Sequence, residues 1–160
     1  MAEPVGTDVL FNHVGLCVSD LERSRRFYED VLGFRHWWEL AVPDEAGSRL
    51  LRLPPPLGAR AVYLVLGRFV LELIHYAAAG TRPGGERVMN DPGLTHLSVA
   101  VADIGAVLEK VVPNGGTVLE DTDMGGLAVM IRDPDGQLIE LTTHGFNERR
   151  PPWPAAAGDE

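Results

Sequence analysis

Two histidine–glutamate pairs at repeated positions are the side chains of this sequence best suited to chemistry. His13 opens the segment HVGLCVSDL (residues 13–21), and His96 opens HLSVAVADI (residues 96–104), which repeats the histidine, valine and aspartate. Downstream of each, Glu72 stands between two leucines and Glu140 between an isoleucine and a leucine. Imidazole nitrogen and carboxylate oxygen together suit Zn, Ni, Co, Mn or Fe(II), so the four residues predict a site for one divalent metal ion.

Strand periodicity supports this site. Alternate residues of a strand face opposite sides, so His13 shares a face with Gly15 and Cys17, whose small side chains leave room for a ligand. Glu72 and Glu140 interrupt apolar strands, where a carboxylate is costly to bury without a compensating charge. Taken singly, each histidine fits a hydrogen-bonded core residue and each glutamate a solvated strand end. Their repetition favours the metal site.

The same repetition predicts the architecture, because an internal repeat specifies one structural unit used twice. The histidines are 83 residues apart and the glutamates 68, which places an insertion in the first copy, at the proline-rich residues 41–60. This insertion is expected to be a loop with a possible short strand at 49–53. Each copy predicts a strand, a helix and three further strands. In the first copy these are 11–18, a helix to about 32, 34–40, 61–66 and 69–76; in the second they are 94–101, a helix capped by Asp103, 117–120, 127–132 and 137–143.

We therefore predict an α+β fold with one domain over residues 9–146. It comprises module one at 9–77 and module two at 92–145, with flexible tails at 1–8 and 147–160. Hydrophobic residues on one face of each predicted helix, such as Leu21, Val31 and Leu32 in the first, are expected to be buried.

Composition narrows the possible partners and compartments. The formal net charge of −9 over 160 residues argues against nucleic acid and anionic membranes, which require a basic surface. No apolar run reaches membrane-spanning length, and residues 1–8 lack a secretion-signal pattern. The single cysteine, Cys17, excludes an internal disulfide bond and fits a reducing compartment. We expect a cytoplasmic protein that binds a small molecule.

The two βαβββ copies, with a histidine on each first strand and a glutamate on each last strand, resemble the vicinal oxygen chelate superfamily. This group includes glyoxalase I, methylmalonyl-CoA epimerase, extradiol dioxygenases and bleomycin- or fosfomycin-resistance proteins. The resemblance covers about residues 9–145, and its most specific signals are residues 13–20, Phe27-Tyr28 and the DPDG run at 133–136. It implies tandem modules whose mixed sheets curl into a barrel-like cleft around one metal, with helices outside. It also implies His13, Glu72, His96 and Glu140 as ligands, and a homodimer.

Within this superfamily the ligand set is most similar to that of bacterial glyoxalase I. The likeness implies a metal-dependent lyase, isomerase or epimerase that removes a proton next to a carbonyl group, with Glu140 as the base and Glu72 as the second choice. The positions that hold glutathione-binding arginine and asparagine in glyoxalase I are Cys17 and Tyr76 here. The substrate is therefore expected not to be glutathione-linked.

Other interpretations of the sequence stay open at this stage. The ligand set also suits an Fe(II) extradiol dioxygenase that cleaves catechol rings, and related drug-binding proteins sequester a compound without chemistry. Aromatic residues near the expected cleft indicate a less polar substrate, although they would equally fit the core: Phe34, Trp37, Trp38, Tyr63 and Tyr76. The remaining histidines, His36, His75 and His144, are expected to be structural or surface residues.

Overall fold

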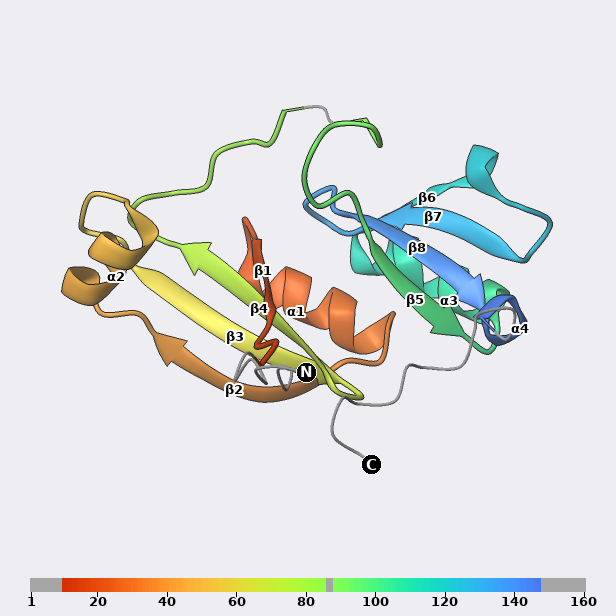
Figure 1. Cartoon of the computed structure of the whole chain (residues 1–160), viewed down its shortest axis with the longest axis horizontal. Helices are drawn as coiled ribbons and strands as arrows, with labels where there is room; N and C mark the ends of the chain where they lie inside the picture. The colour runs from red at the N-terminus through yellow and green to blue at the C-terminus, as the bar shows by residue number, and fades with distance from the viewer. Residues whose placement is uncertain (1–9, 86–87, 148–160) are drawn as a thin grey trace, which may run out of the picture. The chain divides into compact units, whose positions relative to one another are not determined.

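The computed structural model describes residues 10–85 and 88–147, which divide into two compact units (Figure 1). The first unit contains the described residues up to Leu21 together with Phe34–Thr81, and the second contains Glu22–Gly33 together with the described residues from Arg82 onward. Each unit has one four-stranded mixed sheet. The predicted tails, residues 1–8 and 147–160, lie outside the described residues except for Asn147.

The sheet of the first unit has the strand order β1-β4-β3-β2. Strand β1 (Val14–Cys17) runs parallel to β4 (Phe69–Tyr76), which pairs antiparallel with β3 (Ala59–Leu66); β2 (Arg35–Ala41) forms the opposite edge. The β3–β4 hairpin closes through Gly67-Arg68, with Gly67 at a φ of 58°, a conformation that glycine adopts without strain. His13 immediately precedes β1 instead of lying inside it.

The second unit repeats this order as β5-β8-β7-β6. Its strands are β5 (Leu97–Val101), β6 (Thr117–Leu119), β7 (Ala128–Arg132) and β8 (Leu138–Thr143), with β5 parallel to β8. Helix α3 (Ile104–Val111) follows β5, and the Asp103 side chain accepts a hydrogen bond from the Ala106 N–H at 3.0 Å, as predicted for its cap. Two 3-10 helices, Val112–Asn114 and Glu120–Thr122, flank β6, and α4 (His144–Asn147) follows β8.

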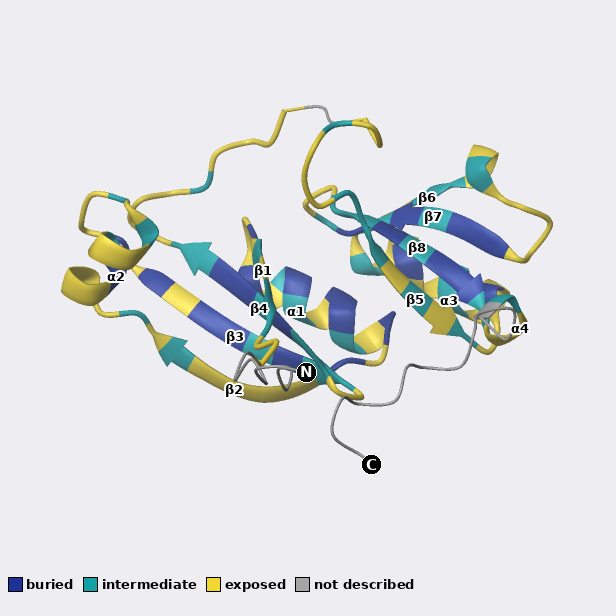
Figure 2. Ribbon diagram, in the orientation of Figure 1, coloured by how far each residue is buried: buried dark blue, intermediate teal, exposed yellow. Residues whose placement is uncertain are grey.

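The predicted α+β class and tandem βαβββ repeat are confirmed. Burial alternates along β1 and β5, the equivalent strands of the two sheets (Figure 2). The leucines and isoleucines on either side of each glutamate are fully buried: Leu71, Leu73, Ile139 and Leu141. Each glutamate therefore lies on the sheet face opposite to the buried row. No helix among the described residues has the length and apolarity needed to cross a membrane.

The insertion in the first unit differs from the prediction. Residues 41–60 contain helix α2 (Asp44–Leu51), and the short strand considered at 49–53 is wrong. Pro43 occupies the N-cap position, where proline does not interrupt a helix, and the Asp44 carboxylate accepts the Leu57 N–H at 2.9 Å. Leu57 is fully buried and anchors the returning chain.

Helix α1 (Leu21–Asp30) contacts the turn between β7 and β8 within the second unit. Phe27 and Tyr28 are fully buried, and the Tyr28 hydroxyl donates a 2.9 Å hydrogen bond to the carboxylate of Asp133. Burial and the nearby charge of Asp133 raise the pKa of Tyr28 well above its ordinary value. Two of the stretches that carry the resemblance, Phe27-Tyr28 and the DPDG turn, are therefore in direct contact.

Candidate metal centre

The first histidine–glutamate pair is brought together in the first unit. The Nε2 atom of His13 lies 3.3 Å from Oε2 of Glu72, although the residues are far apart in the sequence. The parallel register of β1 and β4 places Gly15 beside Glu72, and a Cβ atom at Gly15 would lie 3.0 Å from Oε2 of Glu72. Glycine at this position therefore leaves the carboxylate room to face His13.

The second pair has the same arrangement in the second unit. Nε2 of His96 faces Oε2 of Glu140 at 3.9 Å, and Ser98 is the register partner of Glu140. The Ser98 hydroxyl donates a 2.6 Å hydrogen bond to Oε2 of Glu140. On the other side of the imidazole, Nδ1 of His96 lies 2.9 Å from the Thr95 hydroxyl.

The chemistry of these donors fits a cation. When Nδ1 of His96 carries the ring proton and donates a hydrogen bond to the Thr95 hydroxyl oxygen, the lone pair of Nε2 faces the Glu140 carboxylate. Such an arrangement is favourable once a proton or a metal ion lies near both atoms. In the first unit, Nδ1 of His13 is buried and has no hydrogen-bond partner in the described part of the chain, so the Nε2 side is the interacting side of that ring as well.

Each unit contributes two of the four predicted ligands. Among the residues that the structure describes, no group of three or more histidine, cysteine, aspartate or glutamate side chains is close enough to hold a metal ion. The pairing of His13 with Glu72 and of His96 with Glu140 is observed, whereas binding of all four to one ion stays a prediction.

Tyr63 is a partner of Glu72 that the sequence did not identify. Its hydroxyl donates a 2.7 Å hydrogen bond to Oε1 of Glu72, the oxygen that does not face His13. Burial, followed by the hydrogen bond to Glu72 and the charge of that carboxylate, raises the pKa of Tyr63 to about 12. The signal was present in the hairpin, because a two-residue Gly67-Arg68 turn pairs Tyr63 with Glu72 in register.

Cys17 is the last residue of β1 and Tyr76 is the last residue of β4. Both lie further along their strands than the register pair of Gly15 and Glu72. Burial raises the pKa of Tyr76, and the charges of Cys17 and Glu72 raise it further. The surroundings of this phenol therefore favour its neutral, proton-donating form. The two positions at which the resemblance implies glutathione-binding groups in glyoxalase I therefore hold a thiol and a phenol.

The other histidines lie apart from the pairs. Nδ1 of His75 is 3.0 Å from the carbonyl oxygen of Val18, which holds this ring against the backbone as expected for a structural residue. His36 is exposed on β2, and His144 is the first residue of α4. Among the described residues, neither belongs to a group of three or more side chains that could hold a metal ion.

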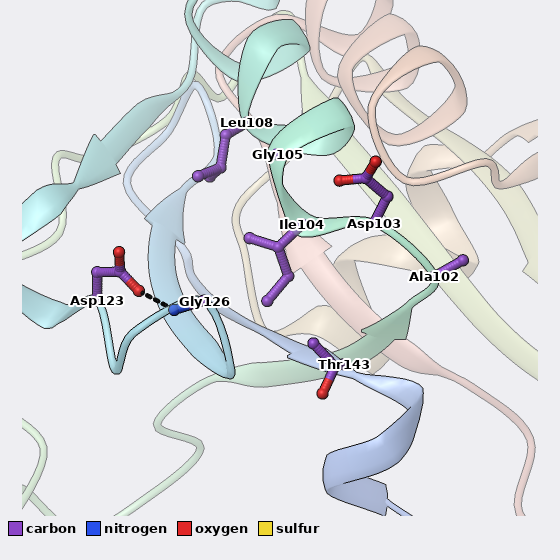
Figure 3. Close-up of a pocket in the computed structure, with 8 residues that line it drawn as sticks. All are labelled: Ala102, Asp103, Ile104, Gly105, Leu108, Asp123, Gly126 and Thr143. Carbon is purple, nitrogen blue, oxygen red and sulfur yellow. Dashed lines mark hydrogen bonds between the residues drawn. The ribbon is translucent and has the colours of Figure 1, made fainter.

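An open pocket of about 430 Å³ lies within the second unit (Figure 3), and neither His96 nor Glu140 lines it. It is bounded by the start of α3, the β6–β7 loop and the end of β8; the lining residues are Ala102, Asp103, Ile104, Gly105, Leu108, Asp123, Gly126 and Thr143. Asp123 is engaged, since its carboxylate accepts the Gly126 N–H at 2.8 Å. Thr143 lies on the face of β8 opposite to Glu140, so this hollow is on the helix side of the sheet.

The family of this chain is shown by its sequence. Residues 10–141 match the Glyoxalase/Bleomycin resistance protein/Dioxygenase superfamily, and the chain belongs to that family. Similar curated proteins are named as lyases and epimerases, which supports an enzyme of this superfamily.

Two relatives illustrate the range of those activities. A lactoylglutathione lyase of Pseudomonas putida is 32% identical, over 88% of this chain and 88% of its own length. A 2-epi-5-epi-valiolone epimerase of an Actinomyces species is 32% identical, over 83% of this chain and 78% of its own length. The chain spans 44% of the length of the lactoylglutathione lyase GLX1 of Arabidopsis thaliana, to which it is 26% identical.

Solved structures show the same fold. A glyoxalase family protein from Bacillus cereus superposes with a TM-score of 0.73 at 19% identity, covering 88% of this chain and 98% of that one. A glyoxalase I of Leishmania major superposes with a TM-score of 0.64 at 22% identity, over 85% and 87% of the two chains.

Proposed function

We propose that the chain is a metal-dependent enzyme of the glyoxalase type, which removes a proton next to a carbonyl group of a small substrate with two neighbouring oxygens. The cation would be held by His13, Glu72, His96 and Glu140. The observation that carries the proposal is the repeated geometry, in which each histidine turns Nε2 toward a carboxylate oxygen, at 3.3 Å in one unit and 3.9 Å in the other. In this proposal, the two histidine–glutamate pairs of one site come either from one chain or from the two chains of a homodimer.

A divalent cation bound there supplies a Lewis acid that stabilises negative charge on the substrate oxygens. The protein must then provide a base, and the two carboxylates are unequally suited. Both oxygens of Glu72 are engaged, by Tyr63 and by His13. For Glu140, Oε2 meets Ser98 and His96, while Oε1 has no partner among the described residues.

We assign the base to Glu140 for this reason. The C–H bond of the substrate breaks, its proton passes to Oε1 of Glu140, and the electron pair moves toward the carbonyl oxygen to give an enolate. Protonation of the opposite face of the same carbon gives epimerisation. Return of the proton to the neighbouring carbon, with the substrate hydroxyl proton moving to the enolate oxygen, gives isomerisation. The Ser98 hydroxyl keeps the carboxylate oriented during both transfers.

The substrate is proposed not to be linked to glutathione. Cys17 and the neutral phenol of Tyr76 replace the charged and amide groups expected for glutathione binding. A kinetic comparison tests this point: the hemithioacetals of methylglyoxal with glutathione and with 2-mercaptoethanol should be turned over with similar kcat/KM. A preference for glutathione above tenfold would contradict it.

Metal binding is tested by equilibrium dialysis of protein purified without chelators against Zn²⁺ or Ni²⁺. Wild type should bind one ion per chain, and His13→Ala and His96→Ala should each weaken binding by at least tenfold because each removes one ligand. His36→Ala is the matched control and should bind normally. Independent effects on two separate weak sites would contradict a shared centre.

The assignment of the base is tested with Glu140→Gln and Glu72→Gln in deuterated water. We follow exchange of the substrate C–H by NMR in metal-loaded protein, using methylglyoxal hemithioacetals. Glu140→Gln should slow exchange by at least a hundredfold, because an amide cannot accept the proton. Undiminished exchange in this variant would falsify the role of Glu140.

A further inference from the structure

Three aromatic side chains form a continuous surface in the first unit, which we call the aromatic shelf: Trp37, Trp38 and Tyr63. The rings of Trp38 and Tyr63 are stacked, with centroids 4.6 Å apart and planes inclined by 7°. Trp37 stands nearly perpendicular to Trp38, at 80° and 6.2 Å. Trp38 is 42% exposed and Trp37 is 59% exposed, so the shelf is open to a ligand.

The shelf is joined to the first donor pair. Tyr63 is the register partner of both Trp38 and Glu72, and its hydroxyl binds the Glu72 carboxylate. The His13 ring also meets the Tyr63 ring edge-on, at 88° and 5.5 Å. Neighbouring strands are about 4.8 Å apart, so the backbone of Trp38 lies roughly 10 Å from that of Glu72. Through Tyr63, the shelf and the donor pair are therefore continuous along one face of the sheet.

A strand irregularity builds this surface. The β2–β3 register shifts between His36 and Trp38, which leaves Trp37 as an extra residue on the edge strand. The fold does not require such a row, because the equivalent positions of the second sheet carry Ser98, Glu140, Met130 and Leu119 without an aromatic ring. The shelf is a property of one unit and not of the repeat.

We propose that the aromatic shelf binds a flat aromatic ring of the substrate, carried on a short spacer from the two oxygens that reach His13 and Glu72. An indole face favours a second π system over a saturated ring, and the perpendicular Trp37 provides an edge contact. This proposal rests on the proposed chelating function, because that function places the two substrate oxygens at His13 and Glu72. Stacking on Trp38 supplies the selectivity for the ring.

A matched pair of ligands isolates the contribution of the flat ring. The probes are 2-oxo-4-phenylbutanoate and 4-cyclohexyl-2-oxobutanoate, which share the oxygens and the two-carbon spacer. Isothermal titration of zinc-loaded wild type should give tighter binding of the phenyl compound by about two- to tenfold, the range typical of an aromatic pair. Trp38→Leu should abolish this preference and leave the cyclohexyl affinity unchanged, whereas Trp38→Phe should retain most of it.

Controls separate this proposal from the metal site and from self-association. Leu50→Ala, on exposed α2 of the same unit, should leave the preference intact. Zinc affinity is measured separately and should be equal in wild type and Trp38→Leu. A phenyl preference that depends on Trp38, with affinities for both compounds that do not change when zinc is removed, would support the shelf and refute the chelating function.

The shelf is overturned if zinc binds while the two compounds bind equally, if neither compound binds, or if Trp38→Leu keeps the preference. Sedimentation velocity tests the alternative that a second copy of the chain occupies the shelf. Dissociation of a dimer by Trp38→Leu, with no change in the ligand preference, would show that a second copy of the chain covers this surface and would overturn the proposal.

Discussion

Glu72 and Glu140 occupy equivalent positions of the two sheets, yet their hydroxyl partners come from different strands. Tyr63 on β3 holds Glu72, whereas Ser98 on β5 holds Glu140. Gly15, which stands where the second sheet has Ser98, cannot provide a hydroxyl group. The long reach of a phenol from the neighbouring strand compensates for the glycine, and the two carboxylates are thereby held in different ways.

The phenol of Tyr63 should matter for metal affinity more than for folding. Tyr63→Phe leaves Oε1 of Glu72 without its hydrogen bond, and loss of a partner that orients a ligand weakens metal binding by about 10- to 100-fold. Isothermal titration with Zn²⁺ measures this change. Tyr76→Phe removes a phenol from the same sheet face and should change the affinity by less than about twofold. Equal effects in the two variants would show that Tyr63 does not orient the carboxylate.

Repetition made the four donors visible in the sequence, since each histidine and glutamate had a counterpart. Tyr63 had none, because Met130 occupies its place in the second sheet. Its role required the cross-strand register, which follows from the two-residue turn only when the hairpin is drawn out residue by residue. Convergence of the two pairs on one ion depends on tertiary arrangement and stays a prediction.

The hairpins were predictable from their turn residues. Helices α1 and α3 were predictable because their apolar residues recur at helical spacing. Helix α2 was missed because Gly47 and the surrounding prolines looked like signals that break a helix. A Cβ atom at Gly47 would lie 2.7 Å from Val42 and 2.9 Å from Leu57. Glycine therefore permits close packing inside this helix, an effect that propensity alone does not reveal.

Contact between α1 and the β7–β8 turn should stabilise the second unit. Asp133 is 4% exposed and accepts hydrogen bonds from the Tyr28 hydroxyl and from the backbone N–H groups of Asp135 and Gln137. Tyr28→Phe removes a hydrogen bond to a buried carboxylate and should lower the free energy of unfolding by about 1.5–3 kcal/mol at pH 7. Urea denaturation followed by circular dichroism measures the change.

The pH dependence of this variant has a definite sign. Burial raises the pKa of Asp133, while its hydrogen bond with Tyr28 lowers that pKa. Loss of the Tyr28 hydroxyl therefore raises the pKa of Asp133 further. The destabilisation caused by Tyr28→Phe should be largest above this pKa and should shrink as Asp133 becomes protonated in acid. Ser24→Ala, which removes a weaker 3.2 Å contact with Asp135, should cost about 1 kcal/mol or less. A pH-independent loss for Tyr28→Phe would contradict the carboxylate as its partner.

Across the whole chain, the two units use one backbone plan for different surfaces. The first unit carries the aromatic shelf and the α2 insertion, while the second carries the Tyr28–Asp133 contact and the Ser98–Glu140 pair. Sequence repetition accounts for the common sheet order. The differences come from the insertion that contains α2 and from single positions, such as Tyr63 against Met130 and Gly15 against Ser98.

All three tyrosines of the chain, Tyr28, Tyr63 and Tyr76, have raised pKa values, with burial as the largest cause in each case. Absorbance at 295 nm should therefore show well under half of the tyrosines ionised at pH 10 in the folded protein. The urea-unfolded chain should be about half ionised at that pH. Since the folded state retains protons that the unfolded state has lost, stability should fall as the pH rises from 10 toward 12, the pKa of Tyr63. Half-ionisation near pH 10 in the folded protein would mean that these phenols are exposed to solvent and that the contacts with Glu72 and Asp133 are absent.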